Sequence, residues 1–110
     1  MVLHQGKINK ELLKGSLEIL LLSVLKQKPL YGYLIVKEIR SRSDEVFSLG
    51  EGTLYPLLHK LEIGGLLESW WQEVDGRRRK YYSLTNKGRK VLADKTAEWQ
   101  VFAHAVKKIM

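Results

Sequence analysis

The sequence predicts a mainly α-helical fold with one small β-hairpin. Three observations predict it. Apolar residues recur with the 3.6-residue period of amphipathic helices in three segments before residue 64. The pair Asp75-Gly76 then separates two runs of β-prone residues, which is typical of a tight hairpin turn. A heptad-like apolar pattern follows, from Asn86 to about Lys108, and predicts a long last helix.

The composition is that of one globular domain. The chain has 110 residues, of which 45% are hydrophobic and 28% charged, and this length can bury one modest core. The absence of cysteine excludes iron–sulfur clusters, zinc fingers, thiol catalysis and disulfide scaffolds. The longest apolar stretch, Leu17 to Leu25, is too short for a membrane span. Because Met1 to Gln5 lacks a signal-peptide layout, we expect a cytoplasmic protein with no membrane partner.

The first helix is predicted over Lys10–Lys26, with Pro29 ending it. Its apolar stripe, which includes Leu20 and Leu21, is wider than one contact surface needs. Such a helix is buried on two sides, so we expect it to touch a second subunit as well as its own core. A second helix is predicted from Tyr31 to Arg42.

The third helix has the clearest pattern, because leucines recur at i, i+3, i+4 and i+7: Leu54, Leu57, Leu58 and Leu61. Gly64-Gly65 is a strong signal for its end. Its start has two interpretations. Ser48 to Glu51 could form a capping box, whereas Pro56 fits best when it is close to the first turn.

The hairpin is predicted to pair Leu66–Val74 with Arg77–Leu84 through the Asp75-Gly76 turn. This register places Trp70 opposite Tyr81. It also predicts a core face made of Leu67, Tyr82 and Leu84.

The last helix is predicted to begin after Thr85, whose side chain can cap it. Leu92, Trp99 and Val106 recur every seven residues, with Phe102 between them, which indicates a short coiled-coil-like seam and a dimer. Three helices followed by a two-stranded ribbon is the order of a winged helix-turn-helix, with the hairpin as the wing. We therefore expect a winged helix-turn-helix DNA-binding domain over residues 1–85 and a C-terminal dimerisation helix over residues 86–110.

The charge is concentrated in one segment. The chain carries a formal net charge of +7, and the residues from Asp75 to Lys90 contribute seven bases and one acid. A small domain with nearly all its excess charge in one segment is typical of proteins that bind a polyanion. We therefore expect nucleic acid as the partner, with a solvated basic face as the plain alternative.

Two groups of side chains are the candidate DNA contacts. With the leucines buried, the third helix turns Tyr55, Pro56 and His59 outward. Thr53 and Lys60 flank them, although Tyr55 could instead lean on the neighbouring helix. The wing contributes a basic run from which we expect two or three residues to make contact, because neighbouring residues on a strand face opposite ways. The full candidate set is Thr53, Tyr55, Pro56, His59, Lys60, Arg77, Arg78, Arg79 and Lys80.

Four short runs of residues resemble a known family. The runs that carry the resemblance are Leu30-Tyr31-Gly32-Tyr33, Gly52-Thr53-Leu54-Tyr55-Pro56, Gly65-Leu66-Leu67-Glu68 and Arg78-Arg79-Lys80-Tyr81-Tyr82. The chain resembles the PadR family of winged-helix transcriptional regulators, in its short form with a single C-terminal helix. The resemblance implies a homodimer on a pseudo-palindromic operator in double-stranded DNA. It also implies repression relieved by a small aromatic or hydrophobic effector.

The sensing surface has two interpretations. Trp99, Phe102 and Val106, together with Leu20 and Leu21, could line a ligand cavity between subunits or form only the dimer core.

We expect no enzyme activity, because there is no cysteine nucleophile and the three histidines lack local partners. His4 and His104 have no metal-ligand spacing, so we expect no metal and no cofactor. The function predicted from the sequence is a dimeric DNA-binding repressor. The alternative is a winged-helix interaction module whose hairpin binds an acidic protein partner.

Overall fold

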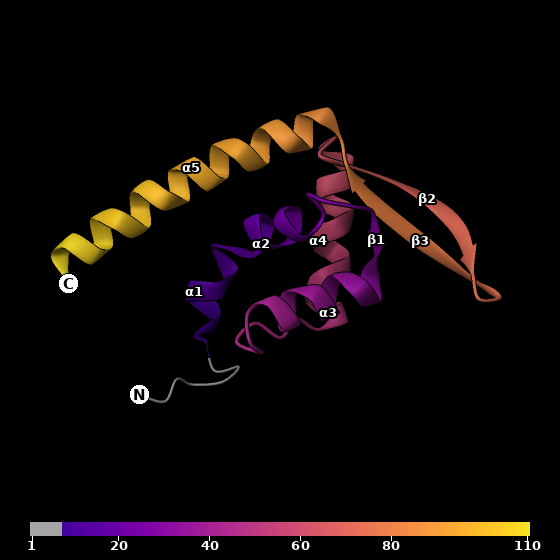
Figure 1. Cartoon of the computed structure of the whole chain (residues 1–110), viewed down its shortest axis with the longest axis horizontal. Helices are drawn as coiled ribbons and strands as arrows, with labels where there is room; N and C mark the ends of the chain where they lie inside the picture. Colours follow the sequence, from indigo (N-terminus) through magenta and orange to yellow (C-terminus); the bar gives the residue numbers. More distant parts are fainter. Residues whose placement is uncertain (1–7) are drawn as a thin grey trace.

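The computed structural model describes residues 8–110, so His4 and the segment from Met1 to Gln5 lie outside the described residues. The fold is mainly helical with a small antiparallel sheet, as predicted (Figure 1). In the described part of the chain, no helix is long and apolar enough to cross a membrane. The elements in chain order are α1 (Lys10–Lys14), α2 (Leu17–Val24), β1 (Leu30–Tyr31), α3 (Gly32–Arg42), α4 (Glu51–Ile63), β2 (Leu67–Val74), β3 (Arg77–Leu84) and α5 (Asn86–Ile109).

Helices α2, α3 and α4 surround one apolar core, and the base of the sheet and the first turns of α5 close it. The side chains of Leu21, Leu22 and Ile35 have no exposed surface. The predicted leucine pattern of α4 is confirmed, because three of its four leucines are buried and the fourth is half-buried. Gly64 caps the end of α4, also as predicted.

The N-terminal helix differs from its prediction. The apolar stripe predicts one helix over Lys10–Lys26, whereas the chain breaks at Gly15-Ser16 into α1 and α2. The Ser16 N–H donates to the Leu13 carbonyl at 2.9 Å. Glycine is a poor helix former, so a break here costs little. The expectation that Pro29 ends this helix is also wrong, since α2 ends at Val24.

The hairpin forms in the predicted register. Asp75 and Gly76 both have positive φ angles, of 53° and 77°, which is the conformation of a type I′ turn. Trp70 lies opposite Tyr81. The predicted core face is also confirmed, because its three members are the buried side chains of the ribbon: Leu67, Tyr82 and Leu84.

A third strand was not predicted. The short strand β1 pairs with β3, placing Leu30 opposite Tyr82 and Tyr31 opposite Tyr81. The sheet order is therefore β1-β3-β2, and helix α3 begins at Gly32 instead of Tyr31. A two-residue strand carries no periodic signal of its own, because its partner strand defines it.

The end of α4, the base of the wing and the start of α5 meet at one junction. Thr85 Oγ1 donates to the Gly65 carbonyl at 2.6 Å and accepts the Gly88 N–H at 2.9 Å, which confirms the predicted cap. Gly88 lies so close to the Leu66 carbonyl that a Cβ atom there would collide with it. Lys87 Nζ donates to the Gly64 carbonyl at 3.0 Å. The direction of α5 is thus tied to the end of α4.

Two elements project from the core in opposite directions, the wing on one side and α5 on the other (Figure 1). The first half of α5 contacts the core through Leu92, which is buried. Its second half extends past α2, and there Trp99 and Phe102 are 50% and 63% exposed.

Candidate nucleic-acid interface

Helix α4 begins with an uncapped first turn. Its N-cap residue is Gly50, which has no side-chain oxygen. The capping box considered for Ser48 to Glu51 does not form, and Pro56 lies inside the helix. The N–H groups at a helix start attract anions when no side chain caps them. This end of α4 therefore suits a DNA phosphate.

One face of α4 is open to solvent. Thr53, Pro56 and His59 are exposed there, on the side opposite the buried Leu58. Their outward orientation agrees with the prediction from the leucine pattern.

Tyr55 has a packing role inside the domain. Its hydroxyl and ring lie against Gly32 so closely that a Cβ atom at residue 32 would collide with them. The ring remains 46% exposed. Tyr55 therefore leans on the start of α3, the alternative that the sequence left open, while its exposed edge still borders the open face of α4.

Lys60 points toward the N-terminal helices. Its ammonium lies 3.2 Å from a Glu18 oxygen, and Lys95 of α5 lies 3.6 Å from the other oxygen of the same carboxylate. Glu18 thus bridges α4 and α5. Exposed ion pairs of this kind contribute little to stability, about 1 kcal/mol or less, so Lys60 can exchange this partner for another anion.

The four basic residues of the wing divide between its two faces. Alternation along β3 places Arg78 and Lys80 on the face that continues the core, and Arg77 and Arg79 on the outer face. Arg77 and Arg78, next to the turn, are exposed. Arg79 and Lys80 are partly buried because both contact other side chains of the domain.

Arg79 belongs to an aromatic cluster on the outer face. Its guanidinium lies 4.7 Å from the centre of the Tyr31 ring. Tyr31 meets Tyr81 edge to face at 5.4 Å, and Trp70 stacks on Tyr81 at 6.2 Å. These contacts join β1, β3 and β2 side by side, and they stiffen the base of the wing.

Lys80 is held on the inner face by α4. Its ammonium lies 3.8 Å from Glu62, whose other oxygen accepts a hydrogen bond of 2.5 Å from Ser69 Oγ. The ammonium also lies 5.7 Å from the centre of the Tyr82 ring. Burial raises the pKa of the Tyr82 hydroxyl, and the negative charge of Glu62 raises it further. This network attaches the wing to α4.

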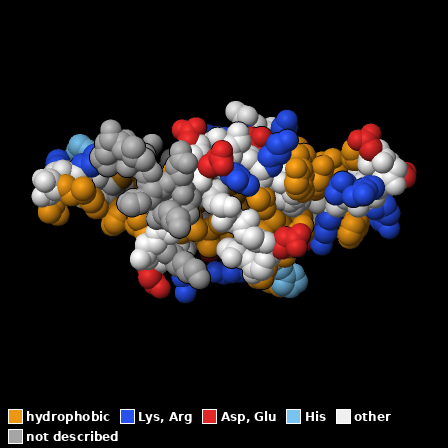
Figure 2. Space-filling model, turned by 90° about the horizontal axis from the view of Figure 1, so that it is seen from below, with side chains coloured by type: hydrophobic (Ala, Val, Ile, Leu, Met, Phe, Trp, Pro, Cys, Tyr) orange, Lys and Arg blue, Asp and Glu red, His pale blue; other side chains and the backbone are white. Residues whose placement is uncertain are grey.

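Figure 2 views the molecule from below Figure 1 and shows Lys and Arg side chains gathered at the wing end. Arg77 and Arg78, at the wing tip, are exposed. The geometry presents an exposed helix face with an uncapped N-terminus and, next to it, a rigid ribbon with a cationic tip. An extended polyanion can contact both at once.

Residues 21–94, more than half of the chain, match the Transcriptional regulator PadR-like family. The chain belongs to this family. A transcriptional regulator of Mycobacterium tuberculosis is 33% identical over 85 residues, which cover 77% of this chain and 77% of that protein. A transcriptional regulator structure from Clostridium thermocellum has a TM-score of 0.84 at 33% identity, covering 93% of this chain and 97% of the other. A PadR-family structure from Eggerthella lenta has a TM-score of 0.77 at 41% identity, covering 90% and 85%.

PadR-family proteins are transcriptional regulators that bind DNA through a winged-helix fold and typically dimerise. Such regulators are generally not enzymes. The resemblance predicted from the sequence is therefore confirmed at the level of family and fold.

The surface predicted for dimerisation or ligand binding in this PadR-like chain lies on α2 and α5. Trp99 and Phe102 are exposed and Val106 is half-buried, all on the face of α5 that meets the core through Leu92. On α2, Leu20 is half-buried and accessible, whereas Leu21 is wholly buried inside the protomer. Leu20 is therefore the member of that pair that a partner can reach.

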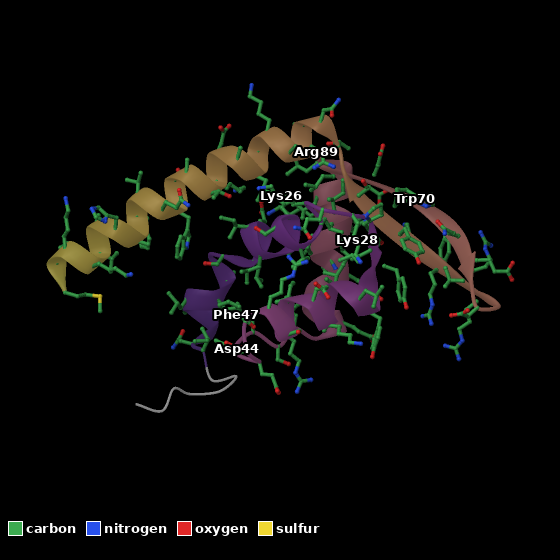
Figure 3. All side chains as sticks on the ribbon, in the orientation of Figure 1. Lys26, Lys28, Asp44, Phe47, Trp70 and Arg89 are labelled. Carbon is green, nitrogen blue, oxygen red and sulfur yellow. The ribbon has the colours of Figure 1, made fainter. Side chains whose placement is uncertain are left out.

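A groove lies between Lys26, which follows α2, the end of β3 and α5. Its volume is about 410 Å³, and its apolar lining includes Leu84 and Leu92. Figure 3 shows Lys26 and Arg89 at this groove, where Arg89 donates a hydrogen bond of 3.1 Å to the Lys26 carbonyl. Trp99 does not line it.

Sequence reasoning missed Glu18, Glu62 and Trp71, which surround the candidate contacts. The hairpin register was a signal for Trp71, because it places this residue opposite Lys80, on the inner face of the wing. No local signal existed for Glu18, since the residues with which it pairs, Lys60 and Lys95, are distant in sequence.

Proposed function

We propose that this protein is a dimeric, sequence-specific DNA-binding repressor whose binding is relieved by a small aromatic or hydrophobic ligand. The observation that supports it best is the open face of α4 with its uncapped N-terminus, in a domain whose wing tip exposes Arg77 and Arg78. Residues 1–85 would act as the DNA-binding domain, and residues 86–110 as the dimerisation helix. The protein would act in the cytoplasm.

On DNA, α4 would enter the major groove with its N-terminal half first. Thr53 and His59 would then face base edges, while the uncapped N–H groups after Gly50 would receive a phosphate. The wing would lie along the adjoining backbone, where arginine can form a fork with phosphate or reach into a minor groove. Among the nine candidate contacts, Arg79 and Lys80 would mainly hold the wing in position.

The dimer would form along α5. The apolar face made of Trp99, Phe102 and Val106 extends beyond the core that covers the first half of the helix. A second copy can bury this face together with Leu20. A two-fold axis there would give the two α4 helices a fixed spacing, and therefore an operator with two inverted half-sites.

A ligand could control DNA binding by changing that spacing. Trp99 offers an exposed ring on which a planar aromatic compound can stack. The junction at Thr85 and Gly88 ties α5 to the end of α4, so a shift of α5 would move α4. We therefore place the effector between the subunits, next to Trp99.

Selection of binding sites from random duplex DNA tests this function. With excess non-specific competitor at near-physiological salt, we expect enrichment of an inverted repeat whose half-sites lie about one helical turn apart. If each protomer neutralises four or five phosphates, log affinity should fall against log salt with a slope of about −7 to −9. A slope shallower than about −3, or recovery of no motif, would contradict the proposal.

A failed selection would favour the other candidate, a winged-helix module that binds an acidic protein. The triple substitution Arg77→Ala, Arg78→Ala and Arg79→Ala separates the two functions. For a DNA-binding regulator it should weaken duplex binding at least about 30-fold and leave the dimer intact. For a protein-binding module it should remove partner capture without changing an already weak affinity for duplex DNA.

A further inference from the structure

Trp71 is a large aromatic residue in the middle of the wing with 57% of its surface exposed. It lies opposite Lys80 in the hairpin. Residues directly opposite each other share one face of a ribbon. Because Lys80 contacts Glu62 of α4, that shared face is the one turned toward α4. Trp71 therefore stands between the cationic wing tip and α4.

Arg78 lies over the Trp71 ring. The guanidinium carbon is 5.1 Å from the ring centre, within the range of a cation–π contact. Arg78 is two residues from Lys80 along β3, so it shares the inner face. That face also carries Glu73, directly opposite Arg78. Lys80 is paired with Glu62 of α4, so Arg78 is the cation of this face that an outside anion can reach. The indole limits the orientations open to the guanidinium before any partner arrives.

The adjacent tryptophan, Trp70, provides a contrast on the outer face. Its ring stacks on Tyr81 at 6.2 Å, and its indole N–H donates to Gln72 at 3.2 Å. Trp70 therefore contributes to the stability of the wing. Trp71 contacts a cation that is itself exposed, so its exposed ring is available to an outside partner.

We propose that Trp71 and Arg78 form one DNA-contacting unit on the inner face of the wing. This inference rests on the proposed function, because its partner is the backbone of a DNA duplex. The guanidinium binds phosphate, and the indole face covers the adjoining sugar while it holds the guanidinium in place. A cation ordered in advance loses less conformational entropy on binding, which raises affinity.

Two neighbouring substitutions test the proposal, since Trp71→Ala and Trp70→Ala remove the same side chain from opposite faces. The probe is a mixed-sequence duplex of about 30 base pairs at low salt, because backbone contacts do not depend on sequence. We expect Trp71→Ala to weaken binding about tenfold and Trp70→Ala less than about twofold. The melting temperature should show the reverse order, with the larger decrease for Trp70→Ala.

A double-mutant cycle then tests whether the two residues act together. The variant with both Trp71→Ala and Arg78→Ala should bind about as weakly as Arg78→Ala alone, and Trp71→Phe should retain most of the affinity. Fully additive losses would overturn the proposal, as would equal losses for Trp70→Ala and Trp71→Ala. In either case the proposed function is still supported if the wild-type protein binds the duplex. If the wild-type protein binds no duplex DNA, both the proposed function and the role of Trp71 and Arg78 are contradicted.

A fluorescence measurement gives a second readout. With Trp70→Phe and Trp99→Phe, Trp71 is the remaining tryptophan, and its emission should be quenched when the duplex is added. With Trp71→Phe and Trp99→Phe, the remaining Trp70 should show little change. Equal quenching of both would contradict a specific role for the inner face.

Discussion

The wing and the second half of α5 both project from the core, but their surfaces and their support differ. Aromatic contacts stabilise the base of the wing, since Arg79 lies on Tyr31 and Trp70 stacks on Tyr81. Its tip is basic. The second half of α5 instead exposes apolar side chains, among them Trp99 and Phe102.

This difference indicates two kinds of partner. A rigid ribbon with free cations at its tip suits a polyanion, because the charges are already in place when it binds. An exposed apolar face on a single helix suits another apolar surface, because burial of that face is the main source of stability for such contacts. We therefore propose that DNA binding takes place on the wing side of the core and self-association on the α5 side.

The largest expected effect is on self-association. Phe102→Glu places a charge on the apolar face of α5 and should weaken the dimer by about 100-fold or more. Val101→Glu is the control, because Val101 is 71% exposed on the opposite face of the same helix. Sedimentation analysis over a range of protein concentrations measures both. If Val101→Glu dissociates the dimer as strongly, the assignment of the apolar face is wrong.

The next effect concerns the wing tip. Replacing Arg77 and Arg78 together by Ala should weaken operator binding about 30-fold at physiological salt and reduce the dimer's salt slope by about 3 to 4, since each protomer loses two phosphate contacts. Arg79→Ala should affect the slope much less, because Arg79 is partly buried beside Tyr31 whereas Arg77 and Arg78 are exposed. Binding titrations at several salt concentrations measure the slopes. Equal slopes for the two variants would show that Arg79 is also a direct contact.

A third prediction concerns the junction that both projections share. Gly88→Ala would place a Cβ atom against the Leu66 carbonyl, and it should lower the free energy of unfolding by about 2 kcal/mol. Gly52→Ala is the control, because the space around that helical position is open, so it should raise stability by about 0.5–1 kcal/mol. Urea denaturation measures both. A neutral Gly88→Ala would mean that α5 can shift freely relative to α4.

The smallest effect is the pH dependence of the wing base. The pKa of Tyr82 is raised in the folded protein, by burial first and then by Glu62. The unfolded chain therefore loses this proton first, and stability should decrease as the pH rises above about 10. Tyr82→Phe should make this decrease shallower, as measured by denaturation between pH 8 and 11. An unchanged pH profile would show that the hydroxyl does not contribute.

The sequence predicted the parts of the fold whose signals are local. The leucine spacing located α4, the Asp75-Gly76 turn set the hairpin register, and Thr85 marked the start of α5. The outward orientation of His59 followed from that same spacing. These features depend on residues within one or two turns of one another.

The errors occurred where distant residues decide the structure. Strand β1 exists because β3 pairs with it. The apolar stripe at the N-terminus predicted one helix, yet the chain bends at Gly15-Ser16 and packs as two. The contacts of the basic residues could not be predicted either. Lys60 forms an ion pair with Glu18, and Arg79 lies over the ring of Tyr31, and both partners are distant in sequence.

By itself, then, the sequence determined the order of the elements, the register of the wing and the location of its charge. Periodicity, turn residues and composition encode these within short stretches of chain. Only the tertiary structure decided which cations are free, because a cation's availability depends on the carboxylate or aromatic ring that the fold brings next to it. Lys80 and Arg78 lie two residues apart on one face of β3, yet Lys80 is paired with Glu62 of α4 whereas Arg78 is exposed above Trp71.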